Sequence, residues 1–364
     1  MALSCGIIGL PMVGKTTFFN LLTGLGVETS AFFSGKTATN TGHVTIPDER
    51  LDYLSAMFKP KKTTYAQVEI IDIPGLVRGA SKGQGSGNEF LSSVRDADLL
   101  AHIVRAFEND DVLHVDDSID IMRDIATIEM ELLFADLQLI ETRLSRISGG
   151  SRKKVEHPLE EPTLKKCQDL LMEEKPLRQL ELSEEEQEAL KHITFLTNKP
   201  MMIVVNVDES QLTSNSYPGK DEVEAYCAEQ GYELLTVCAK TEEEIEQLPE
   251  DDRALFMEEL GISESGINRM AKAVYAQLGL ISFLTAGEDE VRAWTIKKGL
   301  NARKAAGKIH SDIERGFIRA ETVAFKDLNE CGSMAAAREK GCFRLEGKEY
   351  IVNDGDIINF RFNV

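Results

Sequence analysis

Apolar residues along this chain follow two alternating patterns, short continuous runs and helical repeats. Five apolar runs predict buried strands at residues 5–8, 66–73, 98–107, 201–207 and 233–238. Helical periodicity lies between the runs; after the first one, Phe18, Leu21, Leu22 and Leu25 recur at the spacing of one helix face. Strands that alternate with helices predict an α/β fold built on a doubly wound, mainly parallel sheet, with its chemistry at the carboxyl ends of the strands.

A long helical segment interrupts this alternation. Apolar residues spaced alternately four and three apart predict one seam on a helix that runs to about residue 147; they are Ile121, Ile125, Ile128, Leu132, Ala135 and Leu139. A second helix is expected over about 162–180, and the capping box Ser183-x-x-Glu186 predicts the start of a third. We interpret the segment as an antiparallel coiled-coil hairpin, although an ordinary amphipathic surface helix has the same stripe.

The pattern changes again after residue 280. Short strands are predicted at 281–285 and 291–296, a helix at about 303–315 and further strands over 350–364, with a turn at Asn353-Asp354-Gly355-Asp356. This part is interpreted as a small α+β domain of β-grasp type. The expected domains are an α/β domain over 1–120 and 198–280, the helical insertion over 121–197 and the C-terminal domain over 281–364.

The first strand is followed directly by the motif Gly9-x-x-x-x-Gly14-Lys15-Thr16. In such a loop, backbone N–H groups and the helix N-terminus hold phosphates, Lys15 reaches the outer phosphates, and the Thr16 hydroxyl ligates Mg²⁺. Its place between a strand and a helix argues against an accidental glycine-rich turn. The chain is therefore predicted to bind a nucleoside triphosphate through Met12, Val13, Gly14, Lys15, Thr16 and Thr17.

The second apolar run ends in Asp72-Ile73-Pro74-Gly75, the D-x-x-G pattern of a nucleotide switch. Asp72 would hold Mg²⁺ through a water molecule, and the Gly75 N–H would sense the terminal phosphate. The glycine-rich tract at 78–87 is expected to become ordered when phosphate binds, unless it is an inert surface loop. Leu76 stands where related enzymes use Gln to orient water, so another residue must position the water.

Base recognition is expected where Asn206-Val207-Asp208-Glu209 follows the fourth strand, in the place of the guanine-reading N-K-x-D. The motif lysine is absent, and Glu209 replaces the Asp that accepts from two guanine donors. Asp208 lies one residue too early for that role. Adenine lacks both donors, which favours ATP over GTP, with Val207 against the base and Asn206 and Glu209 shaping the pocket. The opposite wall is assigned to Cys238 and Ala239, and a plain GTPase stays an alternative.

Charge and cysteine content narrow the class of protein. The 364 residues carry a formal net charge of −20, yet residues 292–319 contain eight Lys or Arg against Asp312 and Glu314. This basic window suggests a polyanionic partner, with a solvated helix face as the alternative. Trp294 and Phe317 lie in the window as stacking surfaces or as core residues.

The cysteines and the apolar runs bear on the cellular compartment. Six scattered cysteines without a C-x-x-C pair argue against a zinc site and a disulfide framework. No apolar stretch approaches the ~20 residues of a membrane span, so a soluble cytoplasmic protein is expected.

Together with the ending Phe360-Arg361-Phe362-Asn363-Val364, these motifs resemble the Obg-like ATPase, or YchF, family over essentially the whole chain. The resemblance implies an OBG-type nucleotide domain, a coiled-coil insertion and a C-terminal TGS domain of β-grasp fold. It also implies hydrolysis of ATP to ADP and phosphate with Mg²⁺, and binding to the ribosome or ribosomal RNA through the TGS domain and the coiled coil. Neither a membrane partner nor DNA sequence readout is expected.

Three further residues take their roles from this resemblance. Met12 stands where the family has an Asn that aids monovalent-cation binding, which argues against potassium stimulation. Lys36 occupies the position of the Mg²⁺-binding switch threonine, so Thr37 would serve after a shift of one residue. His114 is the candidate that positions the catalytic water after loop movement; a histidine that only packs its loop is the alternative.

The leading hypothesis is a regulatory ATPase whose nucleotide state controls docking on the ribosome. The alternative is a nucleotide-gated protein-binding scaffold or chaperone-like factor, in which hydrolysis is incidental and the coiled coil holds protein partners.

Overall fold

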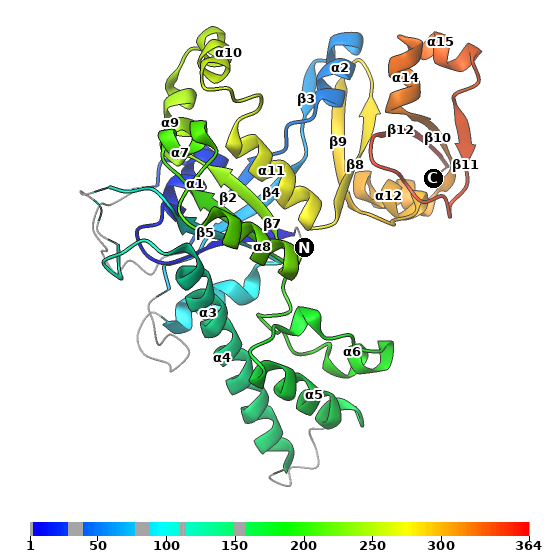
Figure 1. Cartoon of the computed structure of the whole chain (residues 1–364). Helices are drawn as coiled ribbons and strands as arrows, with labels where there is room; N and C mark the ends of the chain where they lie inside the picture. Colours follow the sequence, from blue (N-terminus) through cyan, green and yellow to red (C-terminus); the bar gives the residue numbers. More distant parts are fainter. Residues whose placement is uncertain are drawn as a thin grey trace. The chain divides into compact units, whose positions relative to one another are not determined.

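The computed structural model describes residues 3–27, 39–76, 87–109, 112, 114–148 and 157–363 (Figure 1). The chain divides into two compact units. The first unit comprises Met1–His43 and Glu69–Met270, and the C-terminal unit comprises Val44–Val68 and Ala271–Val364. No helix in these described ranges is long and apolar enough to cross a membrane.

The first unit is built on a six-stranded sheet in the order β2-β4-β1-β5-β6-β7. Its strands are β1 (Ser4–Ile8), β2 (Asn40–Thr45), β4 (Gln67–Asp72), β5 (Leu99–Arg105), β6 (Met201–Asn206) and β7 (Glu233–Val237). The pairs from β4 to β7 are parallel, and every residue of β1, β5 and β6 is buried. Continuous apolar runs are typical of strands covered on both faces. The predicted α/β class is confirmed.

Helices of the first unit connect these strands. They are α1 (Lys15–Thr23), α3 (Gly87–Asp96), α7 (Glu209–Ser214), α8 (Lys220–Gln230), α9 (Ala239–Gln247), α10 (Glu250–Glu259) and α11 (Gly266–Gln277), which continues into the C-terminal unit. Helices α1 and α3 contact β1, whereas α8 contacts β7. Because β1, β4 and β6 run parallel to one another, the loops that follow them lie at the same edge of the sheet.

The helical insertion forms the expected hairpin (Figure 1). Helix α4 (Ile121–Ser148) packs on α5 (Glu160–Met172), and a short 3₁₀ helix (Leu177–Gln179) leads to α6 (Glu184–Leu190). Leu133, Ile140, Leu164, Cys167, Leu171 and Leu190 form part of its core. The predicted capping box of Ser183 and Glu186 is present at the start of α6. Helix α5 ends earlier than predicted, because Glu174 adopts a φ of 59° and Pro176 follows.

The C-terminal unit has a second sheet in the order β11-β10-β12-β8-β9-β3. Its strands are β3 (Lys62–Thr64), β8 (Leu280–Ala286), β9 (Glu290–Lys297), β10 (Phe317–Ala324), β11 (Arg344–Glu346) and β12 (Asp356–Phe362). Strand β12 lies parallel to β8 and antiparallel to β10, while β8 and β9 form an antiparallel hairpin. A final strand inserted beside the first is the arrangement of a β-grasp fold.

Helix α12 (Ala302–Ile309) fills the core of this sheet through Ala302, Ala305 and Ala306. The single helix predicted over 303–315 is two helices, because His310 is extended and its side chain caps α13 (Ser311–Arg315). Two short helices, α14 (Phe325–Cys331) and α15 (Met334–Glu339), follow β10. Neither of these two helices was predicted.

Residues 44–68 lie in a different unit from the one expected. These residues lie between two nucleotide motifs in the sequence, which predicts that they belong to the α/β domain. In the structure β3 pairs in parallel with β9, and α2 (Glu49–Phe58) packs on β8 and β9 with Leu51 and Leu54 fully buried. Arg50 pairs with Asp354 at 2.7 Å. The residues between β2 and β4 are therefore part of the C-terminal unit, whereas β2 and β4 themselves pair in the first sheet.

Candidate nucleotide site

The phosphate loop connects β1 to α1. Gly9 and Gly14 have φ angles of 148° and 100°, which favour glycine. A Cβ atom at Gly9 would lie 2.4 Å from the carbonyl oxygen of Ile103, and one at Gly14 would lie 2.6 Å from the Asn206 amide nitrogen. Both glycines therefore allow the loop to approach β5 and β6 more closely than any other residue would.

Lys15 begins α1, and its ammonium group is nearly buried. Its Nζ donates a hydrogen bond of 2.6 Å to the carbonyl oxygen of Leu10 within the loop. Burial lowers the pKa of Lys15 to about 8, while the neighbouring Asp72 carboxylate acts in the opposite direction. Additional negative charge on the loop would stabilise the charged form of Lys15. The arrangement suits a polyphosphate.

Thr16 and Asp72 meet beside this lysine. The Thr16 hydroxyl donates to Asp72 Oδ2 at 3.1 Å. Burial raises the pKa of Asp72, and Lys15, Thr16 and the side chain of Asn40 oppose that shift. A hydroxyl and a carboxylate are hard oxygen donors of the kind that Mg²⁺ prefers, so the pair fits the expected ion. Among the described residues no group of three His, Cys, Asp or Glu forms a metal site. Phosphate and water oxygens would complete the coordination of Mg²⁺ here.

Asn40 was missed in the sequence. It opens β2, and its side chain forms a hydrogen bond with Asp72. Nothing in its local sequence distinguishes it from the neighbouring polar residues. Two other expected parts of the site, Thr37 and the glycine-rich tract at 79–85, lie outside the described residues.

The segment after Asp72 runs back along the phosphate loop. The Leu76 N–H donates to the carbonyl oxygen of Gly9 at 3.3 Å, and a Cβ atom added to Gly75 would lie 3.2 Å from Lys15 Nζ. The side chain of Leu76 is 1% exposed. It packs in the core, so this position offers no group that could orient a water molecule.

Asn206 ends β6 and joins two parts of the site. Its Nδ2 donates to the carbonyl oxygen of Val13 at 3.0 Å, and its Oδ1 accepts from the Ala239 N–H at 3.1 Å. The Ala106 N–H donates to the Asn206 carbonyl at 2.8 Å. The structure thus brings together the predicted residues Val13, Asn206 and Ala239, with the asparagine as the connection between the phosphate loop and the start of α9.

The residues that follow Asn206 place Glu209 where the guanine motif has an Asp. Asp208 is the N-cap of α7, where its Oδ1 accepts from the Gln211 N–H at 2.9 Å and the Ser210 hydroxyl at 2.7 Å. Glu209 is the first residue of α7 and is exposed. Val207 is buried, and its N–H donates to the Val237 carbonyl at 3.0 Å. Its N–H is therefore committed to the sheet and is not available to a base.

Arg105 organises the loop after β5 and was also missed in the sequence. It is 2% exposed, and its guanidinium donates to the carbonyl oxygens of Phe107, Asn109 and Val112 at 3.0, 3.3 and 2.8 Å. The guanidinium also lies 4.4 Å from the centroid of the Phe107 ring. One buried side chain thereby binds three backbone carbonyl groups between β5 and His114.

His114 is buried at the end of that loop. Its Nε2 lies 3.0 Å from Asp124 Oδ2, and its Nδ1 accepts from the Asp116 N–H at 3.2 Å. The acceptor role of Nδ1 places the proton of a neutral ring on Nε2, which donates to Asp124. Arg123 binds the other oxygen of Asp124. In this conformation both ring nitrogens are engaged within the protein.

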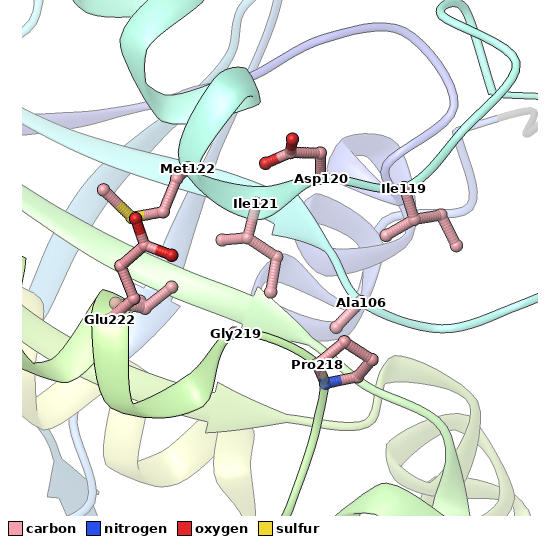
Figure 2. A pocket seen from close by; sticks show the side chains of 9 residues that line it. Ala106, Ile119, Asp120, Ile121, Met122, Pro218, Gly219 and Glu222 are labelled. Atoms are coloured by element: carbon pink, nitrogen blue, oxygen red, sulfur yellow. The ribbon is translucent and has the colours of Figure 1, made fainter.

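A cavity of about 180 Å³ lies between the residues that begin α4 and those that begin α8 (Figure 2). Ala106, Ile121, Pro218 and Val223 provide apolar walls, and Asp120 and Glu222 provide carboxylates. No basic residue lines it. This cavity is therefore unsuited to phosphate, unlike the loop around Lys15.

The basic window of the C-terminal unit has exposed charges and packed aromatic rings. Lys297, Lys298, Arg303 and Lys304 are exposed. Trp294 and Phe317 pack against the hydrophobic core of the unit, and the Trp294 indole N–H donates to Thr285 at 3.0 Å. The core interpretation of the two rings is favoured, and a contact with a polyanion would depend on the charges.

Met12 adopts a left-handed conformation, with φ of 64°. Such a conformation destabilises a residue with an unbranched side chain, whereas Asn tolerates it. Met12→Asn is expected to raise the free energy of unfolding by roughly 1 kcal/mol, as measured by urea denaturation without nucleotide. Met12→Val, a β-branched control, should lower it. A less stable Asn variant would show that the backbone at this position is not strained.

The sheet, the phosphate loop and the Asp72 switch define a P-loop nucleoside triphosphatase of the GTPase-like class. Residues 4–135 match the family profile described as 50S ribosome-binding GTPase, and residues 280–363 match the profile YchF-GTPase_C, described as a protein of unknown function. The chain is 47% identical to the ribosome-binding ATPase YchF of Bacillus subtilis (strain 168) and 44% identical to that of Escherichia coli O157:H7, covering 100% of both chains in each comparison. The chain belongs to the YchF, or Obg-like ATPase, family.

A solved structure supports the same relationship. The YchF GTPase of Schizosaccharomyces pombe is 32% identical, with a TM-score of 0.84, and the match covers 99% of this chain and 98% of that one. The family resemblance inferred from the sequence motifs is thereby confirmed.

Proposed function

We propose that this protein is a ribosome-binding ATPase that changes conformation with its nucleotide state. The full-length relatives from Bacillus subtilis and Escherichia coli carry the name ribosome-binding ATPase. The Schizosaccharomyces pombe protein is described as a GTPase, so the names of the relatives do not decide which purine nucleotide this chain prefers. The observation that carries the ATP preference is the loss of the guanine-reading pattern, with Val207 in the place of its lysine and Glu209 in the place of its Asp.

ATP is favoured by what the base-reading segment lacks. A guanine pocket needs a carboxylate free to accept from N1–H and the 2-amino group. Asp208 already accepts two hydrogen bonds within α7, and Glu209 is longer and begins that helix. Adenine presents neither donor, so it loses nothing in this pocket.

We propose that the nucleotide binds the residues expected from the sequence motifs. Phosphates would contact the loop residues Met12, Val13, Gly14, Lys15, Thr16 and Thr17, and the base would lie among Asn206, Val207, Glu209, Cys238 and Ala239. Since the Val207 N–H is committed to Val237, this residue would offer its carbonyl and side chain only. Mg²⁺ would bind Thr16 directly, Asp72 through water and Thr37 from the switch segment. Met12 in the family's Asn position leads us to propose that potassium does not stimulate turnover.

His114 is proposed to position the attacking water after the loop opens. Opening breaks the 3.0 Å contact with Asp124 and frees Nε2. His114→Ala is expected to keep ATP affinity and to slow single-turnover hydrolysis by about 10² to 10⁴, the usual contribution of such a group. Asp124→Asn, which weakens the hold on the ring, should not slow hydrolysis. Equal rates for His114→Ala and the wild type would leave His114 as a residue that only packs its loop.

Ribosome docking is proposed to use the exposed charges of the basic window. Changing Lys297, Lys298, Arg303 and Lys304 to Glu should weaken co-sedimentation with ribosomes, because each lost phosphate contact removes a counterion-release contribution. Wild-type binding should fall steeply with added salt, and the matched change to Gln should have an intermediate effect. ATP turnover without ribosomes is the internal control. Normal co-sedimentation of the Glu variant at moderate salt would assign docking to another surface.

A second function is favoured by one feature of the helical insertion. Phe134 on α4 and Met172 on α5 are 46% and 70% exposed, so this hairpin offers apolar side chains to a protein partner. A nucleotide-gated scaffold or chaperone-like factor would use them, with incidental hydrolysis. ATP turnover that rises with added ribosomes supports the ATPase role, whereas ribosome-independent capture of protein clients supports the scaffold. In either role we expect the protein to act in the cytoplasm.

A further inference from the structure

Two of the six cysteines differ from the others in exposure and spacing. Cys5, Cys167, Cys227 and Cys238 are 0–2% exposed, whereas Cys331 and Cys342 are partly exposed. The Sγ atoms of Cys331 and Cys342 lie 3.9 Å apart. Eleven positions separate these two cysteines in the chain, so a pattern such as C-x-x-C does not reveal them.

The backbone holds the two thiols close together. Cys331 ends α14, and the following Gly332 caps that helix. After α15, Gly341 turns the chain with φ of 71°, and the Cys342 N–H donates to the Ala337 carbonyl at 2.9 Å. A disulfide has a sulfur–sulfur length of about 2.05 Å, so each sulfur atom has to move by only about 1 Å.

We propose that Cys331 and Cys342 form a reversible disulfide when the protein meets hydrogen peroxide. The Cys331 thiolate attacks one peroxide oxygen, the O–O bond breaks, and the second oxygen leaves as hydroxide, which becomes water. Cys331 is then a sulfenic acid. The Cys342 sulfur attacks that sulfur and expels hydroxide, which takes the Cys342 proton. Two thiols and one peroxide thus give one disulfide and two waters, and a dithiol reductant reverses the change.

The groups around the two cysteines indicate which sulfur reacts with peroxide and which then forms the disulfide. Burial and the hydrogen bond with Cys331 raise the pKa of Cys342, with Asp327 acting in the same direction and Lys340 against it. Either sulfur can donate in their contact. Because the raised pKa of Cys342 disfavours its thiolate, we assign Cys331 as the first sulfur to react. Cys342 is then in place as the resolving thiol.

The disulfide would fix a charged part of the C-terminal unit. The closed loop contains α15, whose Arg338 pairs with Glu321 on β10 at 2.8 Å and lies 4.2 Å from the ring centroid of Phe343. Linking the end of α14 to the residue after α15 restricts the opening of this helix pair. Oxidation is therefore expected to slow hydrogen exchange in residues 325–343.

Thiol counting and peptide mass mapping test the proposal on the full-length protein. Ellman's reagent should detect two thiols in the native protein before peroxide treatment and none after it. Unfolded protein should show six and then four, since the other cysteines are buried in the native state. Mapping without reduction should give one cross-linked peptide pair containing Cys331 and Cys342, lighter by two hydrogens (about 2 Da), and dithiothreitol should restore both thiols.

Matched variants separate the pair from general oxidation. Cys342→Ser should accumulate a sulfenic acid at Cys331 that dimedone traps, whereas the wild type should not. Cys227→Ser, at a buried site, should form the disulfide as the wild type does. Recovery of sulfinic acid at Cys331, disulfide-linked dimers or two unreacted thiols in the treated wild type would overturn the proposal.

Discussion

Replacing Lys15 by Ala is expected to lower the rate of ATP hydrolysis by about 10² to 10³, the usual effect of removing one charge-stabilising donor from a transition state. The ammonium donates to the Leu10 carbonyl at 2.6 Å and lies beside Asp72. Burial of this charge lowers its pKa to about 8, so the lysine contributes little to the stability of the free protein. The variant should therefore fold normally.

Two measurements check this prediction. Steady-state turnover should fall, and the rise in melting temperature produced by MgATP should disappear, because binding no longer stabilises the folded state. Lys165→Ala is the matched control; this lysine is exposed on α5 and pairs with Glu161. A Lys15→Ala variant that keeps wild-type turnover would place the hydrolytic site elsewhere.

Leu54→Ala is expected to destabilise the C-terminal unit by about 2 to 5 kcal/mol, although residue 54 lies between two motifs of the nucleotide site. Leu54 is 0% exposed on α2, which packs on β8 and β9. The same segment supplies β3 and an edge-to-face contact of 5.5 Å between Tyr53 and Phe325. Removing the leucine side chain leaves a cavity under the second sheet.

Hydrogen exchange locates this effect. Amides of β8 and β9 should exchange faster in Leu54→Ala, while those of β5 and β6 should keep their wild-type rates, since exchange reports local stability. Ala56→Ser, an exposed change on the same helix, should alter stability by less than about 0.5 kcal/mol. Unchanged protection of β8 and β9 would show that residues 44–68 are not part of the core of the C-terminal unit.

The elements that the sequence predicts well are those with a strong local cause. Strands such as β1 and β6 are continuous apolar runs, because both of their faces are covered. The start of α6 follows from the capping box of Ser183 and Glu186, which is a local interaction. The phosphate-loop motif likewise identifies Thr16, and the D-x-x-G motif identifies Asp72. The two side chains meet in the structure.

Other features depend on contacts far apart in the chain. Strand β3 has three residues and forms through its pairing with β9, more than two hundred positions later. Strand β2 is partly exposed and lacks an apolar run, so its pattern resembles a polar loop. Asn40 contributes to the site through its hydrogen bond with Asp72, and Arg105 through its hydrogen bonds with backbone carbonyl groups after β5. No spacing in the sequence indicates either contact. His310 divides one predicted helix because its side chain caps the next one.

In the proposed function, an ATP-selective site drives a ribosome-linked cycle. Its most direct test is the measurement of kcat/KM for ATP and for GTP on the purified protein with Mg²⁺, with and without ribosomes. We predict a higher value for ATP in both conditions, and a further increase for ATP when ribosomes are added. A tenfold preference for GTP, equivalent to about 1.4 kcal/mol, would contradict the assignment.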